Sequence, residues 1–321
     1  MVTAMSRCLY CYGELHDGET DFHASCSKKI FGEKSVPAFE YSRSDMDMLA
    51  KQIVASQTTI TGVQPKLSLH LQKHDGSKRL TIVGMQGNFI FKPQTELYRK
   101  LPEIEDLTMH LAEIAKIDVV PHSLIRLADG ELGYISRRID RSDDNSKIAM
   151  EDMCQLTNRT TEHKYRSSYE QIAKKIAEYS TTPKLDLVNF YDIVIFSWIT
   201  GNADMHLKNF SMFSPDDIES RLTPAYDLVS TAIVNPSDTE ELALTLNGKK
   251  SRIEVKDFIE AAARSNISEK IIESLFRKYL SLARKWEIFI DSSFIDDSQK
   301  VEYIRLIESR LLKISDGLMY K

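Results

Sequence analysis

The sequence predicts a mixed α/β (α+β) protein of two lobes, a small N-terminal lobe of strands and helices and a mainly helical C-terminal lobe. Its 321 residues exceed what one hydrophobic core usually serves. Strand-like alternation and short turns gather before residue 140, whereas apolar stripes of helical period dominate after residue 151. We therefore expect three regions, a Cys/His segment at 1–40, the small lobe at 41–140 and the helical lobe at 141–321.

Composition and charge indicate an ordinary globular protein, with 42% hydrophobic and 28% charged residues. The net charge of −5 argues against a large basic surface, so we expect no direct binding of nucleic acid. The longest apolar run, 185–200, contains Asp186, Asn189 and Asp192 and is too polar to span a membrane. No secretory signal opens the chain. We expect a cytoplasmic protein that does not bind membranes.

The first region holds three of the four cysteines. Cys8-x2-Cys11 is followed, after eleven residues, by His23-x2-Cys26. In a reducing cytoplasm this spacing favours metal over disulfides, and thiolates with imidazole suit tetrahedral Zn²⁺. Four filled positions predict a structural site, and the alternative is a set of unrelated thiols in a flexible N-terminus. Cys154 lies alone and is expected in the core.

The small lobe should begin with a helix at 45–56 and a hydroxyl-rich loop that leads into a strand ending at 69. Such a loop can lie over ATP phosphates, although an ordinary surface turn explains it equally well. Further strands are expected at 81–83, 88–91, 123–127 and 132–137, the last two joined as a hairpin through Asp129-Gly130. The second hairpin strand would lead to the hinge between the lobes, where an adenine can bond to the backbone near Ile135 and Arg137.

Lys92 follows the strand at 88–91, and a buried lysine is costly unless it is paired. The next helix offers carboxylates in Glu103-Ile104-Glu105-Asp106. A strand lysine held by a helix carboxylate and directed at the α/β-phosphates is typical of kinases. The alternative is a solvated lysine, with acids that only favour the helix dipole. That alternative is favoured for Glu103 and Asp106.

The most informative stretch is 201–210, in which Asn209 follows Asp204 by five residues, with Asp227 downstream. This is the order that phosphoryl transfer needs, because one carboxylate accepts the hydroxyl proton while an amide and a second carboxylate hold Mg²⁺ on ATP. Protein kinases use the same spacing in a loop after a buried helix. The run at 185–200 predicts such a helix, ended by Gly201. The alternative is an Asp and an Asn that only cap a turn.

The rest of the helical lobe shows core-facing stripes and one turn. They are Tyr169/Ile172/Ile176/Tyr179, Phe258/Ala262, Ile271/Leu275/Leu282 and Tyr303/Ile307/Leu311, with a short hairpin at 242–245 and Asn247-Gly248.

Several motifs together resemble a known family. They are Gly62–Ser68, Phe91-Lys92-Pro93, Glu151–Gln155, Gly201–Phe210, Leu222–Asp227 and Leu242–Leu244. In these the chain is similar to the HipA family of toxin kinases over roughly residues 50–310. The resemblance implies a two-lobed fold related to protein and phosphoinositide kinases, ATP and Mg²⁺ as cofactors, and phosphorylation of serine or threonine. It also implies a HipB-like DNA-binding antitoxin as partner and an aminoacyl-tRNA synthetase as substrate, whose phosphorylation stalls translation.

The resemblance assigns roles to matching residues of this chain. Asp204 matches the catalytic Asp, Asn209 and Asp227 match the Mg²⁺ ligands, and Lys92 matches the nucleotide-binding Lys. Further nucleotide contacts are expected from Gly62, Val63 and Gln64 of the phosphate loop, and from Ile135, Arg137 and His206.

The chain departs from full-length HipA at its N-terminal end. The stretch before Asp45 is too short for the extra β-subdomain of HipA, so the chain resembles HipT, the short kinase of three-component HipBST systems in which a small protein, HipS, supplies that piece. HipT carries hydroxyl residues just before the glycine of its phosphate loop, and Thr59 and Thr61 match them. We expect autophosphorylation there, the alternative being threonines that only satisfy backbone groups in a turn. The Cys/His head is absent from HipA.

Three functions are consistent with this sequence. An active Ser/Thr kinase toxin is favoured, because Lys92, Asp204, Asn209 and Asp227 are all present. A catalytically dead kinase fold could instead serve as a binding or scaffold module through its Cys/His head. A kinase of a small molecule or lipid is the third reading, since phosphoinositide kinases share the Asp-x4-Asn arrangement.

Overall fold

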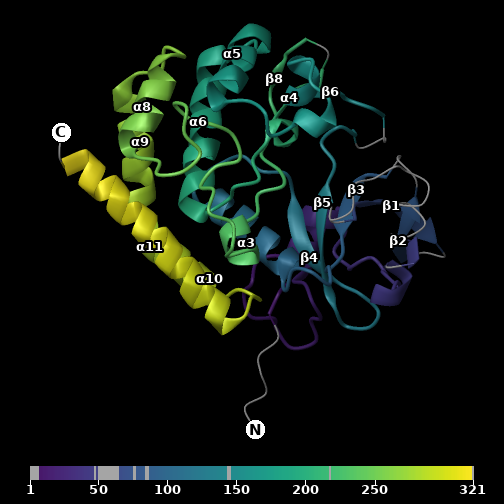
Figure 1. Ribbon diagram of the computed structural model, residues 1–321. Coiled ribbons are helices and arrows are strands. Elements are labelled where there is room, and N and C mark those ends of the chain that lie inside the picture. The colour runs from purple at the N-terminus through teal and green to yellow at the C-terminus, as the bar shows by residue number, and fades with distance from the viewer. Residues whose placement is uncertain are drawn as a thin grey trace. The chain divides into compact units, whose positions relative to one another are not determined.

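The computed structural model describes residues 7–46, 48–49, 65–74, 77–83, 87–142, 146–216 and 218–319. The chain divides into two compact units, and Figure 1 labels most of their helices and strands. Unit 1 comprises Met1–Asp106, Val120–Ser146 and Ser292–Phe294, and unit 2 comprises Leu107–Val119, Lys147–Asp291 and Ile295–Lys321. The division therefore falls within helix α3 (Leu101–Ile114).

Unit 1 is built on a five-stranded antiparallel sheet of order β2-β1-β3-β5-β4. The strands are β1 (Leu67–His74), β2 (Ser77–Val83), β3 (Phe89–Lys92), β4 (His122–Arg126) and β5 (Leu132–Arg137). All the strands predicted for the small lobe are present, although β1 ends five residues later than expected and β2 starts four residues earlier. The central strand β3 pairs Phe91 with both Leu67 and Ile135, so the residues just before Lys92 are enclosed by neighbours on both sides.

Two helical segments accompany this sheet. Helix α1 (Ala24–Phe31) lies in the N-terminal segment and ends at Gly32, whose left-handed backbone (φ 75°) suits glycine. Residues 43–46 and 48–49 are helical, in agreement with the start of the predicted helix, and the rest of that helix lies outside the described residues. The hairpin turn between β4 and β5 holds this segment, because Asp129 Oδ2 accepts the Arg43 amide at 2.6 Å and Glu131 binds the Arg43 side chain at 2.9 Å.

Unit 2 is mainly helical, as predicted, and α6 (Pro183–Thr200) runs through its core. Nearly every side chain of α6 from Phe190 onward is buried, and its aromatic rings pack on other helices: Trp198 lies 5.3 Å from Phe258, and Phe196 lies 5.9 Å from Trp286. The remaining helices are α4 (Met153–Leu156), η1 (Thr161–His163), α5 (Tyr169–Tyr179), η2 (Leu207–Asn209), α7 (Thr231–Val234), α8 (Val255–Ala263), α9 (Glu269–Leu280), α10 (Ala283–Asp291) and α11 (Asp297–Met319).

Unit 2 also contains a three-stranded antiparallel sheet that the sequence did not predict. Its strands are β6 (Ala149–Asp152), β7 (Ser211–Ser214) and β8 (Arg221–Leu222), in that order. Strands of two to four residues are too short to show an alternating pattern, which explains the omission. Strand β7 directly follows the loop at 201–210 and therefore fixes the end of that loop.

Two of the predicted helical stripes are wrong in detail. Helix α9 buries Ile272, Phe276 and Tyr279, whereas Ile271 is exposed, so the core stripe is displaced by one residue from the predicted one. Helix α5 buries its first three stripe residues but exposes Tyr179. The Asn247-Gly248 turn is confirmed, with positive φ at both residues, but the predicted hairpin is reduced to one bridge between Leu246 and Lys249, and residues 242–245 form no strand. Cys154 is buried as expected.

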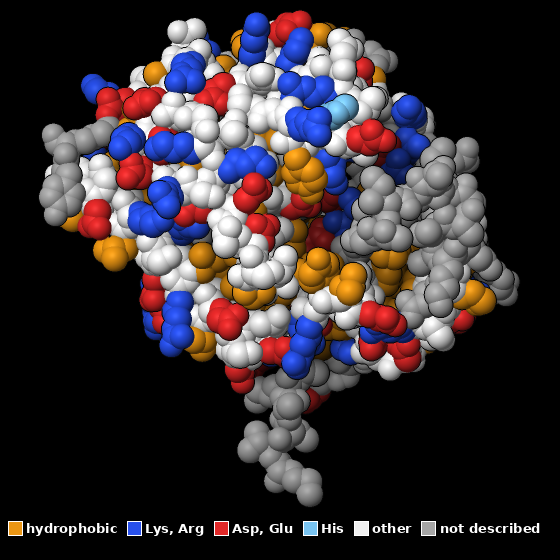
Figure 2. Space-filling view, viewed as in Figure 1, with side chains coloured by type: hydrophobic (Ala, Val, Ile, Leu, Met, Phe, Trp, Pro, Cys, Tyr) orange, Lys and Arg blue, Asp and Glu red, His pale blue; other side chains and the backbone are white. Residues whose placement is uncertain are grey.

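On the face shown in Figure 2, acidic and basic side chains are interspersed, in keeping with the modest net charge of −5. Within the described residues, no helix combines the length and the hydropathy needed to cross a bilayer.

A buried ionic cluster in the core of unit 2 provides a test of the fold. Asp192 on α6 accepts bonds from Lys278 Nζ (2.5 Å) and from the Tyr279 hydroxyl (2.6 Å). Asp192→Ala leaves both donors without this acceptor and should lower the free energy of unfolding by about 3 kcal/mol. Asp192→Asn keeps an acceptor and should cost clearly less. Urea unfolding of the two variants checks this, and equal losses would contradict it.

Candidate active site

In unit 1 the structure pairs Lys92 with Glu105, as the sequence predicted. Lys92 ends β3 and is only 4% exposed, and its Nζ lies 2.5 Å from Glu105 Oε1 on α3. The same ammonium faces the ring of Tyr134 on β5, 5.3 Å from the ring centroid. A buried ammonium needs such partners, because its desolvation would otherwise outweigh any gain from packing.

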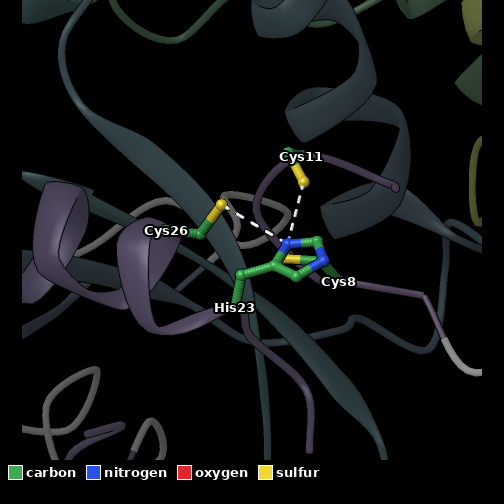
Figure 3. Close-up of side chains that lie close together, drawn as sticks. All are labelled: Cys8, Cys11, His23 and Cys26. Atoms are coloured by element: carbon green, nitrogen blue, oxygen red, sulfur yellow. Dashed lines mark hydrogen bonds between the residues drawn. The ribbon is translucent and has the colours of Figure 1, made fainter. Parts of the chain in front are cut away.

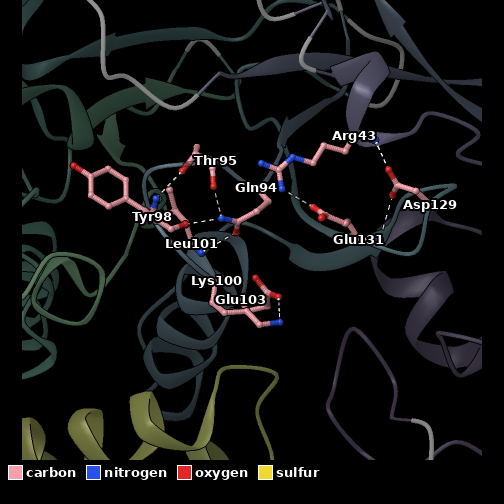
Figure 4. Close-up of polar contacts among 9 residues, drawn as sticks. All are labelled: Arg43, Gln94, Thr95, Tyr98, Lys100, Leu101, Glu103, Asp129 and Glu131. Carbon is pink, nitrogen blue, oxygen red and sulfur yellow. Dashed lines mark hydrogen bonds and ion pairs between the residues drawn. The ribbon is translucent and has the colours of Figure 1, made fainter.

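The Gln94 side chain holds the connection between β3 and α3 (Figure 4). Its amide nitrogen donates to the carbonyls of Thr95 (2.6 Å) and Tyr98 (2.5 Å), and its amide oxygen accepts the N–H of Leu101 at the start of α3 (3.2 Å). The last bond satisfies a backbone donor that the first turn of a helix leaves unpaired. Gln94 therefore sets where α3 begins, and with it the position of Glu105 one turn later.

The other two acids of α3 are not the solvated groups that the sequence favoured. Glu103 is buried and binds Lys100 at 2.7 Å. Asp106 is fully buried and binds the Tyr12 hydroxyl and the His122 ring, each at 2.7 Å. The expectation that both acids are solvated and only favour the helix dipole is thus wrong, because their hydrogen-bond and ion-pair partners offset the cost of burial.

In unit 2 the loop after α6 is formed by a helix stop at Gly201. Its backbone is left-handed (φ 69°), and a Cβ atom there would lie 2.7 Å from side-chain atoms of Ala232 and Leu306. No other residue fits both conditions. The Thr231 hydroxyl then donates to the Gly201 carbonyl (3.1 Å) and accepts the N–H of Ala203 (2.8 Å), so the loop is held by the start of α7.

This loop presents Asp204 and Asn209 in a fixed relation. The Asp204 amide donates to Asn202 Oδ1 (3.0 Å), and Asn209 Nδ2 donates to the Asp204 carbonyl (2.9 Å). The second bond orients the Asn209 amide so that its oxygen is the atom that can bind a cation. The carboxylate of Asp204 is 39% exposed and is therefore accessible to a substrate.

The rings of Tyr165 and His206 adjoin the Asp204 carboxylate, and the sequence indicated a site role only for His206. The Tyr165 hydroxyl donates to Asp204 Oδ1 at 2.5 Å, and its ring meets the His206 ring edge-on at 4.9 Å. Burial and the Asp204 charge raise the pKa of Tyr165, so the phenol stays protonated. Tyr165 lies 39 residues from Asp204 in no local pattern, so the sequence carried no signal for it.

His206 is a neutral side chain beside two carboxylates. Burial lowers its pKa to about 4, although the charges of Asp204 and Asp227 act in the opposite direction. Its Nε2 lies 3.9 Å from Asp204 Oδ1. At neutral pH the ring thus adds no positive charge to the site.

Asp227 lies near this loop, since its charge acts on His206. Its backbone is left-handed (φ 56°), a region that Asp tolerates better than most residues. The preceding Tyr226 anchors the segment, because its hydroxyl donates to the Lys208 carbonyl (3.1 Å) and pairs with Ser211 Oγ (2.7 Å). Asp204, His206, Asn209 and Asp227 are thus gathered in one part of unit 2.

The Glu151–Gln155 motif has a role in the same neighbourhood. Asp152 caps α4 through a reciprocal pair of bonds with Gln155, and its other carboxylate oxygen binds Lys208 Nζ at 2.6 Å. Lys208 lies between His206 and Asn209 in sequence, so this ion pair holds the loop from the β6 side. The sequence singled out the motif without identifying this contact.

The predicted adenine contacts lie at the end of an internal strand. Ile135 is fully buried between β3 and β4, and the Arg137 amide donates to the Pro121 carbonyl at 2.8 Å. The predicted phosphate-loop residues Gly62, Val63 and Gln64 and the predicted phosphorylation sites Thr59 and Thr61 lie outside the described residues.

The structure brings the four predicted zinc ligands together in unit 1 (Figure 3). We name Cys8, Cys11, His23 and Cys26 the Cys/His cluster; their ligand atoms all lie within 4.8 Å of one another. Burial and, after it, the charges of the neighbouring Cys8 and Cys11 together raise the pKa of Cys26 to about 12. For Cys8, burial also acts upward, but hydrogen bonds from the backbone of Cys11, His23 and Tyr10 outweigh it and lower the pKa.

The arrangement in unit 2 suits chemistry on a hydroxyl and a divalent cation. An exposed carboxylate, Asp204, can accept a proton, while the Asn209 oxygen and the Asp227 carboxylate are hard oxygen donors of the kind that Mg²⁺ prefers. In unit 1 the Lys92 ammonium is a fixed positive charge of the kind that binds phosphate.

Comparison with known proteins identifies the family. The HipA-like C-terminal domain matches residues 58–286. A relative in Sinorhizobium fredii, named "Putative kinase Y4dM", is 29% identical over 248 residues, which are 73% of this chain and 60% of the relative. The serine/threonine-protein kinase toxin HipA of Shewanella oneidensis is 25% identical over 209 residues, 59% of this chain and 46% of that protein. The chain thus spans about half the length of these two curated relatives.

A solved structure shows the same fold. The complex of HipA, HipB and operator DNA from the Shewanella oneidensis toxin–antitoxin system superposes with a TM-score of 0.67 at 18% identity, over 95% of this chain and 75% of that one. The predicted mixed α/β, HipA-like fold is therefore confirmed.

The buried His206 should make stability depend on pH. Its pKa is about 4 in the folded protein against about 6.5 when unfolded, so the unfolded state binds more protons between these values. Stability is therefore lost as the pH falls, by about 2 kcal/mol from pH 7 to pH 5 for this group alone. In urea unfolding without nucleotide, His206→Gln should lose about that much less than the wild type over the same interval. Equal losses in the two proteins would exclude this account.

Proposed function

We propose that this chain, which belongs to the family of HipA-like C-terminal domains, transfers the γ-phosphoryl group of ATP to a serine or threonine of a protein. The observation that carries the proposal is the loop after α6, in which an exposed Asp204 carboxylate and an oriented Asn209 amide are held by backbone bonds, with Asp227 nearby. These three groups have the roles that phosphoryl transfer requires.

In the proposed reaction, Asp204 accepts the proton of the acceptor hydroxyl. Asn209 and Asp227 hold Mg²⁺, which supplies neutralisation of the phosphate charge when it is bound. Lys92, oriented by Glu105, binds the α/β-phosphates. Further nucleotide contacts come from His206 in the loop, the residues around Ile135 and Arg137, and the segment Gly62–Gln64. Most of the catalysis then comes from positioning and from fixed charges.

We further propose that the kinase is the toxin of a toxin–antitoxin system. The relative named as a kinase toxin supports this, and the solved HipA complex, which includes HipB and operator DNA, supports a HipB-like antitoxin as partner. The proposed substrate is an aminoacyl-tRNA synthetase, whose phosphorylation would inhibit translation. Thr59 and Thr61, placed as in HipT, support a three-component arrangement with a HipS-like small protein.

One experiment tests the proposed function directly. Purified protein is incubated with ATP·Mg²⁺ and a cell extract, and phosphorylated products are identified by mass spectrometry. A serine or threonine phosphorylated on one protein supports the proposal and names the substrate. Phosphate found only on a small molecule or a lipid would contradict a protein kinase, and no transfer at all would point to a scaffold.

The catalytic assignment predicts the effect of removing single carboxylates. Asp204→Asn and Asp227→Asn should each lower phosphate transfer by on the order of a hundredfold or more, and should abolish growth arrest, because each removes a group that acts on the reacting atoms or on Mg²⁺. Both variants should retain the wild-type circular dichroism spectrum.

Asp297→Asn is the matched control, since this carboxylate is 98% exposed on α11 and forms an ion pair with the neighbouring Lys300. Its activity should equal that of the wild type. Near-normal transfer by folded Asp227→Asn would refute the assignment.

The second expectation concerns regulation in the phosphate loop. Autophosphorylation of Thr59 or Thr61 would add roughly −1.5 to −2 charge beside the triphosphate and should weaken ATP binding. Mass spectrometry should find phosphate on these threonines in the wild type and not in Asp204→Asn. Thr59→Asp and Thr61→Asp should bind ATP more weakly than the matching alanine variants. Unmodified threonines in an enzyme that phosphorylates other proteins would rule this regulation out.

A further inference from the structure

The Cys/His cluster has the separations of a tetrahedral metal site. Zn²⁺ that holds sulfur at about 2.3 Å and imidazole nitrogen at about 2.0 Å in tetrahedral geometry places these two atoms about 3.5 Å apart. Cys11 Sγ and Cys26 Sγ lie 3.4 Å and 3.7 Å from His23 Nδ1. The side chains therefore already stand at ligand distances around a common centre (Figure 3).

The imidazole is also presented in the correct tautomer. His23 Nε2 lies 2.8 Å from the Glu14 carbonyl oxygen, which can only accept a hydrogen bond. Nε2 therefore carries the proton of the neutral ring, and Nδ1, which faces the sulfur atoms, is the nitrogen that can bind a metal. Metal-binding histidines are oriented in this way by a backbone carbonyl or a carboxylate.

The segment that carries the cluster is attached to an edge of the sheet in unit 1. The Leu9 carbonyl accepts the Leu124 amide (3.3 Å) and the Ser123 hydroxyl (3.2 Å), and Asp21 binds Arg126 at 2.9 Å. All three partners lie on β4, which is an edge strand. The segment thus covers an edge whose backbone groups would otherwise be open to solvent.

Tyr12, the residue after Cys11, connects the cluster to helix α3. Its amide donates to the Cys8 carbonyl (2.9 Å), its backbone is left-handed (φ 62°), and its hydroxyl donates to Asp106 Oδ2 (2.7 Å). A tyrosine in this backbone region is strained and persists only where its surroundings fix it. Here it is fixed at both ends, by the turn of the cluster and by Asp106.

From Asp106 a continuous set of contacts returns to Lys92. Asp106 Oδ1 binds His122 Nδ1 at 2.7 Å. The His122 ring stacks on Tyr134 with centroids 6.0 Å apart, and Lys92 Nζ faces the Tyr134 ring. Glu105, the neighbour of Asp106 in α3, holds Lys92 directly. A shift of this part of α3 would therefore disturb the Lys92 ammonium by two routes.

We propose that the Cys/His cluster binds one Zn²⁺ and that this site holds α3, through Tyr12 and Asp106, in the position that places Glu105 on Lys92. With four protein ligands the site has no open position, so it is structural and acts on the nucleotide site only by positioning. Tyr12 is then a positioning residue. The link to nucleotide binding rests on the proposed kinase function, whereas the metal site and the anchoring of α3 do not.

Metal analysis tests the first part of the proposal, that the Cys/His cluster binds zinc. Full-chain protein from zinc-supplemented culture should contain about one zinc per chain, and Co²⁺ in its place should show the visible bands of a tetrahedral thiolate site. Cys11→Ser combined with Cys26→Ser should lose the metal, whereas Cys154→Ala, at a buried thiol in unit 2, should retain it. Protein without stoichiometric metal would overturn the site.

Removing the Tyr12 hydroxyl tests the second part of the proposal, the anchoring of α3, without changing the four metal ligands. Tyr12→Phe keeps the ring and should keep the zinc, but loses the bond to Asp106. Amide hydrogen exchange at the start of α3 should become faster, and the dissociation constant for ATP should rise about threefold to tenfold, the equivalent of one net hydrogen bond. Tyr10→Phe is the control in the same turn, since the contact of its ring with Lys29 remains.

The outcomes distinguish a failure of the anchoring role from a failure of the proposed kinase function. Unchanged exchange in α3 and unchanged ATP affinity in zinc-loaded Tyr12→Phe would overturn the anchoring role. Faster exchange in Tyr12→Phe, together with a wild-type protein that binds no ATP, would support the anchor and reject the kinase assignment instead. Equal effects of Tyr10→Phe and Tyr12→Phe would show that the hydroxyl on Asp106 is not the link.

Discussion

The buried ammonium of Lys92 is the constraint around which unit 1 is arranged. A lysine at 4% exposure cannot remain charged without a close anion, so Glu105 must lie within bonding distance. This requirement fixes α3 against β3, and Gln94 fixes the residue at which α3 begins. Buried ion pairs are weak evidence for stability, because a well-packed apolar pair of similar volume is often as stable. Burying the Lys92 ammonium is costly, so its presence is better explained by an anionic ligand that it binds. In the proposed kinase this ligand is a phosphate of the nucleotide.

Unit 2 positions its candidate catalytic group through the backbone rather than by burial. Its candidate catalytic carboxylate has to stay accessible, so it cannot be fixed by burial. The backbone is fixed instead: α6 is stopped at Gly201, the next residues are bound by Thr231 and Asn202, and the loop ends in β7. Asn209 completes this by binding the Asp204 carbonyl rather than its carboxylate. An exposed side chain on a rigid backbone meets the demand for a group that is both precisely placed and free to react.

The parts of this fold that the sequence predicted are those with strong local signals. The apolar run of α6, its stop at Gly201, and the hairpin of β4 and β5 each follow from residues close together in the chain. The parts it missed depend on distant partners. Asp106 was expected in solvent because nothing near it reveals Tyr12, 94 residues away, and Tyr165 is joined to Asp204 across 39 residues. The strands β6 to β8 are too short for their pattern to be distinguished from a loop.

The contact of Tyr165 with Asp204 bears on how a substrate would be recognised. In the proposed reaction the acceptor hydroxyl donates to the Asp204 carboxylate, of which Oδ1 already accepts the Tyr165 phenol at 2.5 Å. A carboxylate accepts several hydrogen bonds, so the acceptor hydroxyl can bind Oδ2 without displacing the phenol, and this single bond is the same for any serine or threonine hydroxyl. Selectivity for a protein substrate must then come from contacts away from the reacting hydroxyl. The phenol stays protonated and the adjacent His206 stays neutral, so neither competes with Asp204 for the substrate proton. In the proposed reaction Asp204 is therefore the group that accepts the proton, and the surface around it determines which substrate is bound.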